Sequence, residues 1–294
     1  MTHSAADLTE GDESSVAGQV DSTPLLDRLA VRSLGDDEFF GFPPGGFAQR
    51  VFGGHLLAQA VRSGAETVAA SRVINSLHAY FLRPGAPGGE LRYAVTRVRD
   101  GGSFSVRSVA ITQNGVQLAL AGLTFAEDRP ATDAVSAAMP DVPSPEHLPA
   151  LHERRARGLP ADGITRPPRR NWLTASRPLD IRYVDDSARR CFWFRAGPAE
   201  GATQNEHRAV LAFASDRSLL PAIDQARGEL GATGRRAASL DHALWFHADV
   251  RAGEWLLFSQ DSPASTAGTG LARGLIHNRD GVVVASVAQQ GVFS

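Results

Sequence analysis

At 294 residues, with 43% hydrophobic and 21% charged residues and a mean hydropathy of −0.17, the chain has the composition of a soluble globular protein with a full core and no membrane span. Its 30 basic residues, every one of them Arg, nearly balance 32 acidic ones, and the net charge of −2 provides no broad field to attract nucleic acid. Without Lys, a Schiff-base enzyme, a pyridoxal-phosphate enzyme and a Walker-type phosphate loop are excluded, and we expect no cofactor.

The N-terminal residues 1–22 are polar and lack both the basic start and the apolar run of a signal peptide. They predict a flexible tail. Thr23-Pro24 then opens a short helix or strand lead-in that runs to about Leu34. The single Cys191 cannot form a disulfide or a Cys-based metal site within the chain, which favours a reducing, cytoplasmic location.

Residues 23–126 predict one helix followed by an antiparallel meander. Apolar residues recur at helical spacing from Gly53 to Val68. Four strands with turn residues between them follow, at 73–82, 90–99, 104–113 and 116–125. Asn114-Gly115, between two apolar runs, is a strong hairpin signal.

Residues 127–178 are rich in Pro, Ala, Asp and Arg and predict a linker. Residues 179–294 then repeat the plan of the first half. Strands are expected at 179–183 and 191–196, a helix at about 208–220, and further strands at 238–248, 254–260, 270–277 and 282–289.

The repeat can be seen in two matching motifs. His78-Ala79 in the first half has a counterpart in His242-Ala243, and the turn glycines Gly115 and Gly281 follow at nearly the same spacing. Chance spacing of common turn residues is the alternative explanation. Two copies of one unit predict an α+β fold of the double-hotdog type, in which the two sheets join edge to edge around two central helices. As apparent equivalents, the two histidines are expected to be structural hydrogen-bonders.

The usual catalytic signatures are absent from the sequence. It contains no Gly-x-Ser-x-Gly elbow, His-Glu-x-x-His motif, paired Cys or Gly-x-Gly-x-x-Gly loop. The close pair His242 and His247 has a five-residue offset, which places the two side chains on opposite faces of a strand. We expect no metal site.

Several motifs together resemble the acyl-CoA thioesterase II family, over about residues 40–125 and 178–293. They are Val51-Phe52-Gly53-Gly54-His55, Leu77-His78-Ala79-Tyr80-Phe81-Leu82-Arg83-Pro84-Gly85, Arg99-Asp100-Gly101-Gly102-Ser103-Phe104-Ser105, Asp241-His242-Ala243-Leu244-Trp245-Phe246-His247, Glu254-Trp255-Leu256-Leu257, Asp280-Gly281-Val282-Val283-Val284-Ala285-Ser286 and Gln289-Gln290-Gly291-Val292. The resemblance implies a double-hotdog hydrolase of acyl-CoA that forms no covalent intermediate.

The resemblance also implies the residues that act. An Asp, a Thr or Ser, and a Gln of the family hold the attacking water, and they fall on Asp216, Ser239 and Gln289. Asp216 would accept the proton, best with a pKa raised by an apolar setting, and the other two would orient the water. The backbone amides of Gly54 and His55, at the start of the first long helix, are the expected donors to the carbonyl oxygen.

The chain departs from the family pattern in the part expected to bind CoA. Thr269 stands where an Arg is usual, and Gln290 where a Glu is usual. Arg273 is retained and is our expected substrate contact. If the missing Arg helps to hold the CoA phosphates, Arg273, Arg83 or Arg107 must take its place, or the affinity for CoA is weaker.

Projecting the three positions onto the first half by the same offsets gives Phe52, Asn75 and Leu123, which predicts one functional site per chain. Each residue also has a structural alternative, namely a helix cap or ion pair for Asp216, a strand-edge hydroxyl for Ser239 and an exposed amide for Gln289. An enoyl-CoA hydratase would need an Asp and a His in one helix-opening motif, which the sequence lacks. A non-catalytic acyl-CoA or lipid-binding protein is the remaining alternative. We expect acyl-CoA as the partner, and a homo-oligomer.

Overall fold

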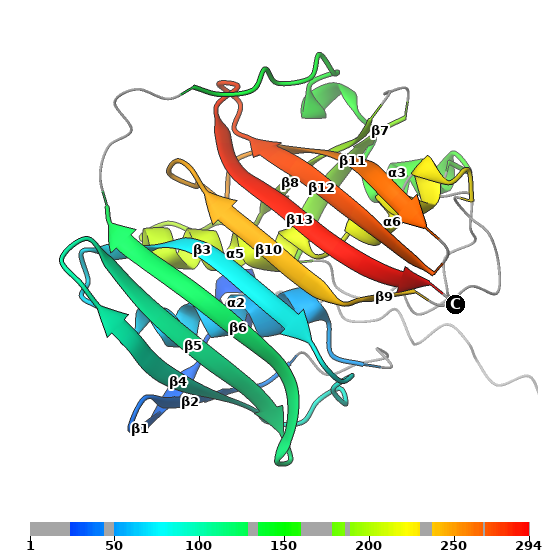
Figure 1. The fold of residues 1–294 in the computed structure, drawn as a ribbon. Coiled ribbons are helices and arrows are strands. Elements are labelled where there is room, and N and C mark those ends of the chain that lie inside the picture. Colours follow the sequence, from blue (N-terminus) through cyan, green and yellow to red (C-terminus); the bar gives the residue numbers. More distant parts are fainter. Residues whose placement is uncertain are drawn as a thin grey trace, which may run out of the picture.

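The computed structural model describes residues 24–43, 50–128, 135–159, 178–185, 189–229, 237–266 and 268–293. Within these residues the strands form one 13-stranded sheet in the order β1-β2-β4-β5-β6-β3-β10-β13-β12-β11-β8-β7, with β9 pairing to β13 (Figure 1). The helices α2 and α5 lie together against its inner side. The predicted α+β double hotdog is therefore confirmed.

The first half contains two helices and six strands within the described residues: α1 (Leu25–Arg28), β1 (Arg32–Gly35), β2 (Glu38–Gly41), α2 (Gly53–Ala65), β3 (Arg72–Phe81), β4 (Leu91–Asp100), β5 (Phe104–Gln113) and β6 (Val116–Glu127). The four central strands are those predicted. The edge hairpin β1–β2 was not predicted, because every residue of β1 is exposed and gives no alternating pattern. Its turn residues Asp36 and Asp37 have φ of 52° and 58°, a conformation that Asp tolerates better than most residues.

The second half contains β7 (Leu179–Val184), β8 (Arg190–Ala196), α5 (Gln204–Ser215), α6 (Leu219–Ala226), β9 (Ala237–Ser239), β10 (Asp241–Phe246), β11 (Leu256–Thr266), β12 (Thr269–His277) and β13 (Val283–Phe293). Two predictions need correction here. The helix expected at 208–220 is two helices, α5 and α6, with a break at Asp216–Ser218. The strand expected at 238–248 is two strands, β9 and β10, with a break at Leu240.

The two halves join where β3 pairs antiparallel with β10. His78 lies opposite Ala243, and His242 lies opposite Ala79. Since residues opposite each other share a face, the two histidines lie on opposite faces of the sheet, and their predicted equivalence is wrong. His78 is exposed and its ring packs edge-on against Trp245 at 5.0 Å, whereas His242 is buried.

The described part of the predicted linker packs on the second half of the sheet. It contains the short helices η2 (Pro145–His147) and α3 (Leu151–Ala156). The Trp193 indole donates to the Pro143 carbonyl at 3.0 Å, and Arg279 pairs with Glu146 at 2.8 Å. This segment helps to cover the buried Cys191. No helix in the described part of the chain is long and apolar enough to span a membrane.

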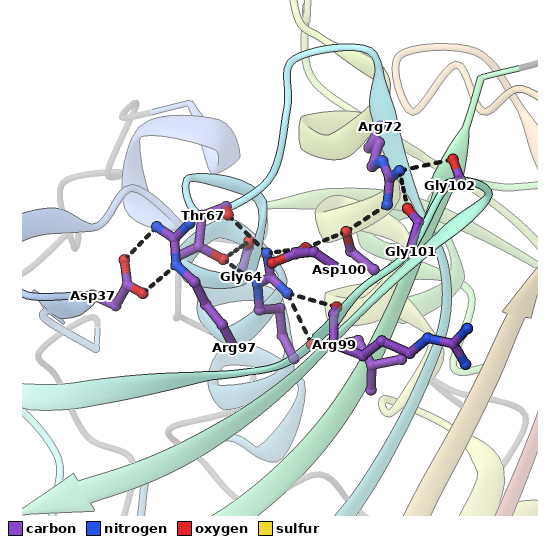
Figure 2. Close-up of polar contacts among 12 residues, drawn as sticks. Asp37, Gly64, Thr67, Arg72, Arg97, Arg99, Asp100, Gly101 and Gly102 are labelled. Carbon is purple, nitrogen blue, oxygen red and sulfur yellow. Dashed lines mark hydrogen bonds and ion pairs between the residues drawn. The ribbon is translucent and has the colours of Figure 1, made fainter.

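A buried arginine ties the C-terminal end of α2 to the β4–β5 hairpin. Arg107, only 1% exposed, donates to the hydroxyl and carbonyl of Thr67 at 2.8 and 3.0 Å and pairs with Asp100 at 2.7 Å. At the turn of the same hairpin, Arg72 donates to the carbonyls of Gly101 and Gly102 (Figure 2). The bond to the Thr67 carbonyl is buried and supplies a donor to an oxygen that water does not reach.

Candidate functional site

Asp216 lies where the two central helices meet. It follows the last residue of α5, and its carboxyl group faces the first turn of α2. A Cβ added at Gly53 would stand 2.6 Å from Oδ2 of Asp216, and one at Gly54 would stand 2.4 Å from the Phe213 carbonyl oxygen. Glycine at both positions therefore permits the helices to approach closely.

The start of α2 has no capping side chain from its own segment. Its N-cap is Phe52, which makes no side-chain hydrogen bond to the helix, and the first turn contains no acidic residue. The carboxyl group of Asp216 comes from the other half of the chain and lies at this helix start instead, where the Gly54 amide lowers its pKa. A helix N-terminus attracts negative charge, so this end of α2 suits either a carboxylate or a developing oxyanion.

The Asp216 side chain is 6% exposed. Burial raises its pKa to about 7, against the opposing effects of the Gly54 amide and the Gln289 side chain. Its Oδ1 atom has no hydrogen-bond partner of good geometry among the described residues. A carboxyl group with a pKa near neutrality can both take up and release a proton at physiological pH.

Gln289 and Ser239 join Asp216 from two neighbouring strands. The buried Gln289 projects from the inner face of β13, and its Nε2 donates to Oγ of Ser239 at 2.7 Å. Ser239 stands opposite Gly291 in the β9–β13 pairing and is half-buried. The structure thus brings all three predicted residues together from three separate segments.

His242 is a site residue that the sequence interpretation missed. Its Nδ1 lies 2.6 Å from Oε1 of Gln289 and 3.9 Å from Oδ1 of Asp216, and its Nε2 lies 2.9 Å from Oγ of Ser215. Burial lowers its pKa to about 4, so the ring is neutral at pH 7. The available signal was its two-residue spacing with the apolar Leu244 and Phe246, which marks the core face of the strand.

The two expected backbone donors differ in their surroundings. The Gly54 amide is directed at the Asp216 carboxyl group. The His55 amide instead donates to the Phe52 carbonyl at 3.0 Å. The His55 ring is 1% exposed, and burial lowers its pKa to about 4. Of the two, only Gly54 has its amide at the carboxyl group.

Arg273 does not join this cluster. Its neighbour Ala272 is the residue opposite Gln289 in the β12–β13 pairing, so Arg273 and Gln289 project from opposite faces of the sheet. The Arg273 side chain is 60% exposed and pairs with Asp261 at 2.7 Å.

The projection of the three site positions onto the first half also needs correction. Phe52 is the N-cap of α2, whereas Asp216 is the C-cap of α5. The constant offset fails because α6 and β9 lengthen the connection between helix and central strand in the second half. By position at the helix end, the counterpart of Asp216 is Glu66, the C-cap of α2.

The opposite end of the helix pair is occupied by structural bonds. Asn205 accepts the Ile74 amide at 2.8 Å and donates to the Arg72 carbonyl at 3.0 Å. Arg208 donates to the Ile74 carbonyl at 2.7 Å. These side chains of α5 bond to the backbone of β3. This end of the helix pair therefore has a structural role, unlike the end that holds Asp216.

Comparisons with known proteins identify the family. Residues 43–126 match the family model of the acyl-CoA thioesterase N-terminal domain, and residues 183–292 match that of acyl-CoA thioesterase. Human acyl-coenzyme A thioesterase 8 is 32% identical over 301 residues, which cover 96% of this chain and 92% of that protein. The chain belongs to the acyl-CoA thioesterase family.

Two further relatives of this thioesterase cover nearly the whole chain. Acyl-CoA thioesterase 2 of Haemophilus influenzae is 28% identical, over 91% of this chain and 93% of that protein. The crystal structure of acyl-CoA thioesterase II TesB2 from Mycobacterium marinum is 30% identical, with a TM-score of 0.73 over 91% of this chain and 97% of that one. The resemblance to the thioesterase II family is thereby confirmed.

The thioesterase also contains a hydroxyl–imidazole–amide chain that looks like a nucleophilic triad, formed by Ser215, His242 and Gln289. Ser215, however, has no exposed surface, and its hydroxyl group also lies 3.1 Å from the Ala212 carbonyl within α5. A nucleophile must reach the substrate carbonyl, which a fully buried hydroxyl cannot do. The arrangement therefore favours activation of a water over an acyl-enzyme.

Proposed function

We propose that this thioesterase hydrolyses acyl-CoA to a free fatty acid and CoA, using a water held by Asp216, Ser239 and Gln289. The observation that carries the proposal is the buried carboxyl group of Asp216 at the uncapped start of α2, beside the hydrogen-bonded Gln289–Ser239 pair. A proton acceptor, two polar groups that orient a water and a helix N-terminus lie within one cluster, which suits hydrolysis of a carbonyl compound.

In the proposed reaction, the water oxygen forms a bond to the thioester carbonyl carbon while its proton passes to Asp216. The bond between this carbon and the CoA sulfur then breaks, and the sulfur leaves with the electron pair. The proton held by Asp216 returns to the sulfur or to solvent, so the carboxylate is regenerated. A carboxyl pKa of about 7 matches this role, because both protonation states are populated at neutral pH.

The Gly54 amide is the proposed donor to the carbonyl oxygen as negative charge develops on it. The same amide counteracts the rise in the pKa of Asp216, because it stabilises the negative charge of the carboxylate. It stands within the first turn of α2, where the helix dipole adds to the stabilisation of an anion. Binding of the thioester would therefore exchange one acceptor for another at the same helix end.

Arg273 remains the proposed contact to CoA phosphates. An exposed guanidinium group and the resemblance of its segment to the family support this proposal. Because the group lies away from the reacting atoms, Arg273→Ala should raise KM for acyl-CoA and leave kcat unchanged. Arg279→Ala, another exposed arginine of the second half paired with a carboxylate, is the matched control.

The proposed function is tested by following thiol release from acyl-CoA substrates of several chain lengths. We expect release by the wild type and a loss of about 1,000-fold or more in Asp216→Asn, which has nearly the same size but cannot accept a proton. Glu254→Gln, at the exposed ion pair with Arg251, should retain full activity. Binding of every acyl-CoA without release would instead identify a non-catalytic binding protein, and full activity of Asp216→Asn would refute the site assignment.

A further inference from the structure

A hydrogen-bonded chain of buried side chains leads from α5 to the proposed water site. It runs from Ser215 through the ring of His242 to the Gln289 amide and ends at Ser239, with successive distances of 2.9, 2.6 and 2.7 Å. Ser215, His242 and Gln289 are each no more than 1% exposed. His242 has no role in the proposed reaction as described for Asp216, Ser239 and Gln289.

The Asp216 carboxylate determines the direction of these hydrogen bonds. The Gln289 amide contacts both Ser239 and Asp216. Since an ionised carboxylate can only accept, the edge of the amide that faces Asp216 must be its NH2 group. The carbonyl oxygen Oε1 then faces His242, and Nδ1 of that ring must carry a proton in order to donate to it.

A neutral histidine has only one N–H group, so Nε2 of His242 must be the acceptor. The Ser215 hydroxyl lies within reach of two acceptors, this nitrogen at 2.9 Å and the Ala212 carbonyl oxygen at 3.1 Å, and in this tautomer its single proton is directed to Nε2. In the opposite tautomer, Nδ1 would require a donor, and the amide would have to turn by 180°. Its oxygen would then face Asp216, a repulsive contact in the ionised state that the proposed reaction requires, and Ser239 would lose its donor.

We propose that His242 is a positioning residue whose Nδ1–H group holds the Gln289 amide with its NH2 edge toward Asp216 and Ser239. The inference deepens the proposed function and rests on it, because Gln289 orients the water only in this setting. A single misplaced amide would both weaken the orientation of the water and remove a donor from the proton acceptor.

The charged groups around the ring are few, which makes the effect on pH dependence interpretable. The nearest carboxyl groups are Asp216, whose Oδ1 lies 3.9 Å from Nδ1 of His242, and Asp241, which precedes the histidine and projects from the other face of the strand. The strands β3 and β13 contribute Ala79 and Gln289, and α5 contributes Ser215. Of these groups, Asp216 is the one whose ionisation the proposed reaction requires.

Three substitutions of His242 separate positioning from packing. In His242→Asn the side-chain NH2 can occupy the place of Nδ1, in His242→Gln it reaches the place of Nε2, and His242→Leu retains volume without a donor. We expect the Asn variant to keep kcat within about threefold of the wild type. The Gln and Leu variants should lose about tenfold or more in kcat with KM within about twofold.

The pH profile gives a readout that a merely structural role would not move. The Gln289 side chain lowers the pKa of Asp216, so its release should raise that pKa. The midpoint at which kcat rises with pH should therefore shift upward in the Leu and Gln variants and stay in place in the Asn variant. Equal kcat in all three variants, or an unmoved midpoint in an impaired Leu variant, would refute the positioning role.

The tautomer of His242 can be measured in the wild-type protein, independently of the activity of any variant. Nitrogen-15 NMR distinguishes the two tautomers of a neutral histidine, and at pH 8.5 the Asp216 carboxyl group is mostly ionised. The signal of His242 is assigned by its loss in the Asn variant. We expect the Nδ1–H form. An Nε2–H form would overturn the inference. It would not affect the proposed function, which is tested separately by the activity of Asp216→Asn.

Discussion

Gly53 and Asp216 lie so close together that a Cβ atom on the glycine would stand 2.6 Å from Oδ2 of the carboxyl group. One residue opens the helix of the first half, and the other closes the helix of the second half. The proposed site is therefore built at the internal interface, and neither half contains both components. Each hotdog unit needs the other to complete the site. Because both units belong to one polypeptide, the helix start of the first half always meets Asp216 of the second half.

This contact predicts different results for two neighbouring glycines. Gly53→Ala would meet the carboxyl end of Asp216 and the ring of Phe81, so we expect kcat to fall about tenfold or more with a modest change in Tm. Gly54→Ala would meet the Phe213 backbone oxygen at 2.4 Å, which cannot move without separating the helices, and Tm should fall by several degrees. Gly197→Ala, with open space around it, is the control for both measurements. Equal kcat and Tm in all three variants would contradict the close approach.

Asp216 should oppose stability at the pH where it supports activity. Burial raises its pKa from an ordinary value of 3.8 to about 7. The folded protein therefore holds this proton more tightly than the unfolded chain, and the associated stability is present below pH 4 and lost as the pH rises through 7. Asp216→Asn removes the penalty, which is on the order of a few kcal/mol because each pKa unit corresponds to about 1.4 kcal/mol. Thermal unfolding should show a higher Tm for this variant at pH 8.

The pH dependence provides the control for this prediction. At pH 5 the carboxyl group of the folded protein is protonated, so the gain in Tm from Asp216→Asn should be less than half of that at pH 8. Asp261→Asn, at the exposed pair with Arg273, should show no such pH-dependent gain. A decrease in Tm at pH 8 would mean that Asp216 is held mainly by its hydrogen bonds and not disfavoured by burial.

Much of the fold could be predicted from the sequence because its signals are local. Alternating apolar residues with Asp-Gly-Gly or Asn-Gly between them mark β4, β5 and β6, and a second set of strands marks the repeat. The break at Asp216 was missed since apolar residues continue at helical spacing on both sides of it. A local signal was nevertheless present, because Ser218 is a favourable N-cap residue and indeed precedes α6.

The candidate site was only partly predictable, because contacts between distant segments determine it. Asp216, Ser239 and Gln289 were identified by resemblance, and the structure shows how they meet. The role of His242 depended on the register between β3 and β10, and a shift of one residue reverses the face of a side chain. The matching His-Ala pairs suggested that His78 and His242 are equivalent, and only the pairing of β3 with β10 could test this.

The activity should rise with pH through the ionisation of Asp216. With a pKa of about 7, the carboxylate is half-populated near pH 7, and kcat should fall about tenfold for each unit below that range. The pKa of His242, lowered to about 4 by burial, keeps the ring neutral from pH 5.5 upward, so it should add no second limb. Thiol release is measured from pH 5.5 to 9, with the rate of Asp216→Asn subtracted as background. A kcat that does not fall between pH 7 and pH 5.5 would show that Asp216 is not the proton acceptor.

Arg107 should be essential for stability and dispensable for chemistry. It is 1% exposed and holds Thr67, at the end of α2 away from Asp216, to Asp100 of the β4–β5 hairpin. Arg107→Met leaves the Thr67 carbonyl without its buried donor, and we expect a loss of about 3–5 kcal/mol in the free energy of unfolding, measured in urea. Arg97→Met, at the exposed pair with Asp37 in Figure 2, should leave the unfolding midpoint nearly unchanged. Since the substitution lies far from the carboxyl group, kcat per folded molecule should be retained. Loss of kcat in a folded Arg107→Met protein would instead mean that this end of α2 controls the position of its first turn.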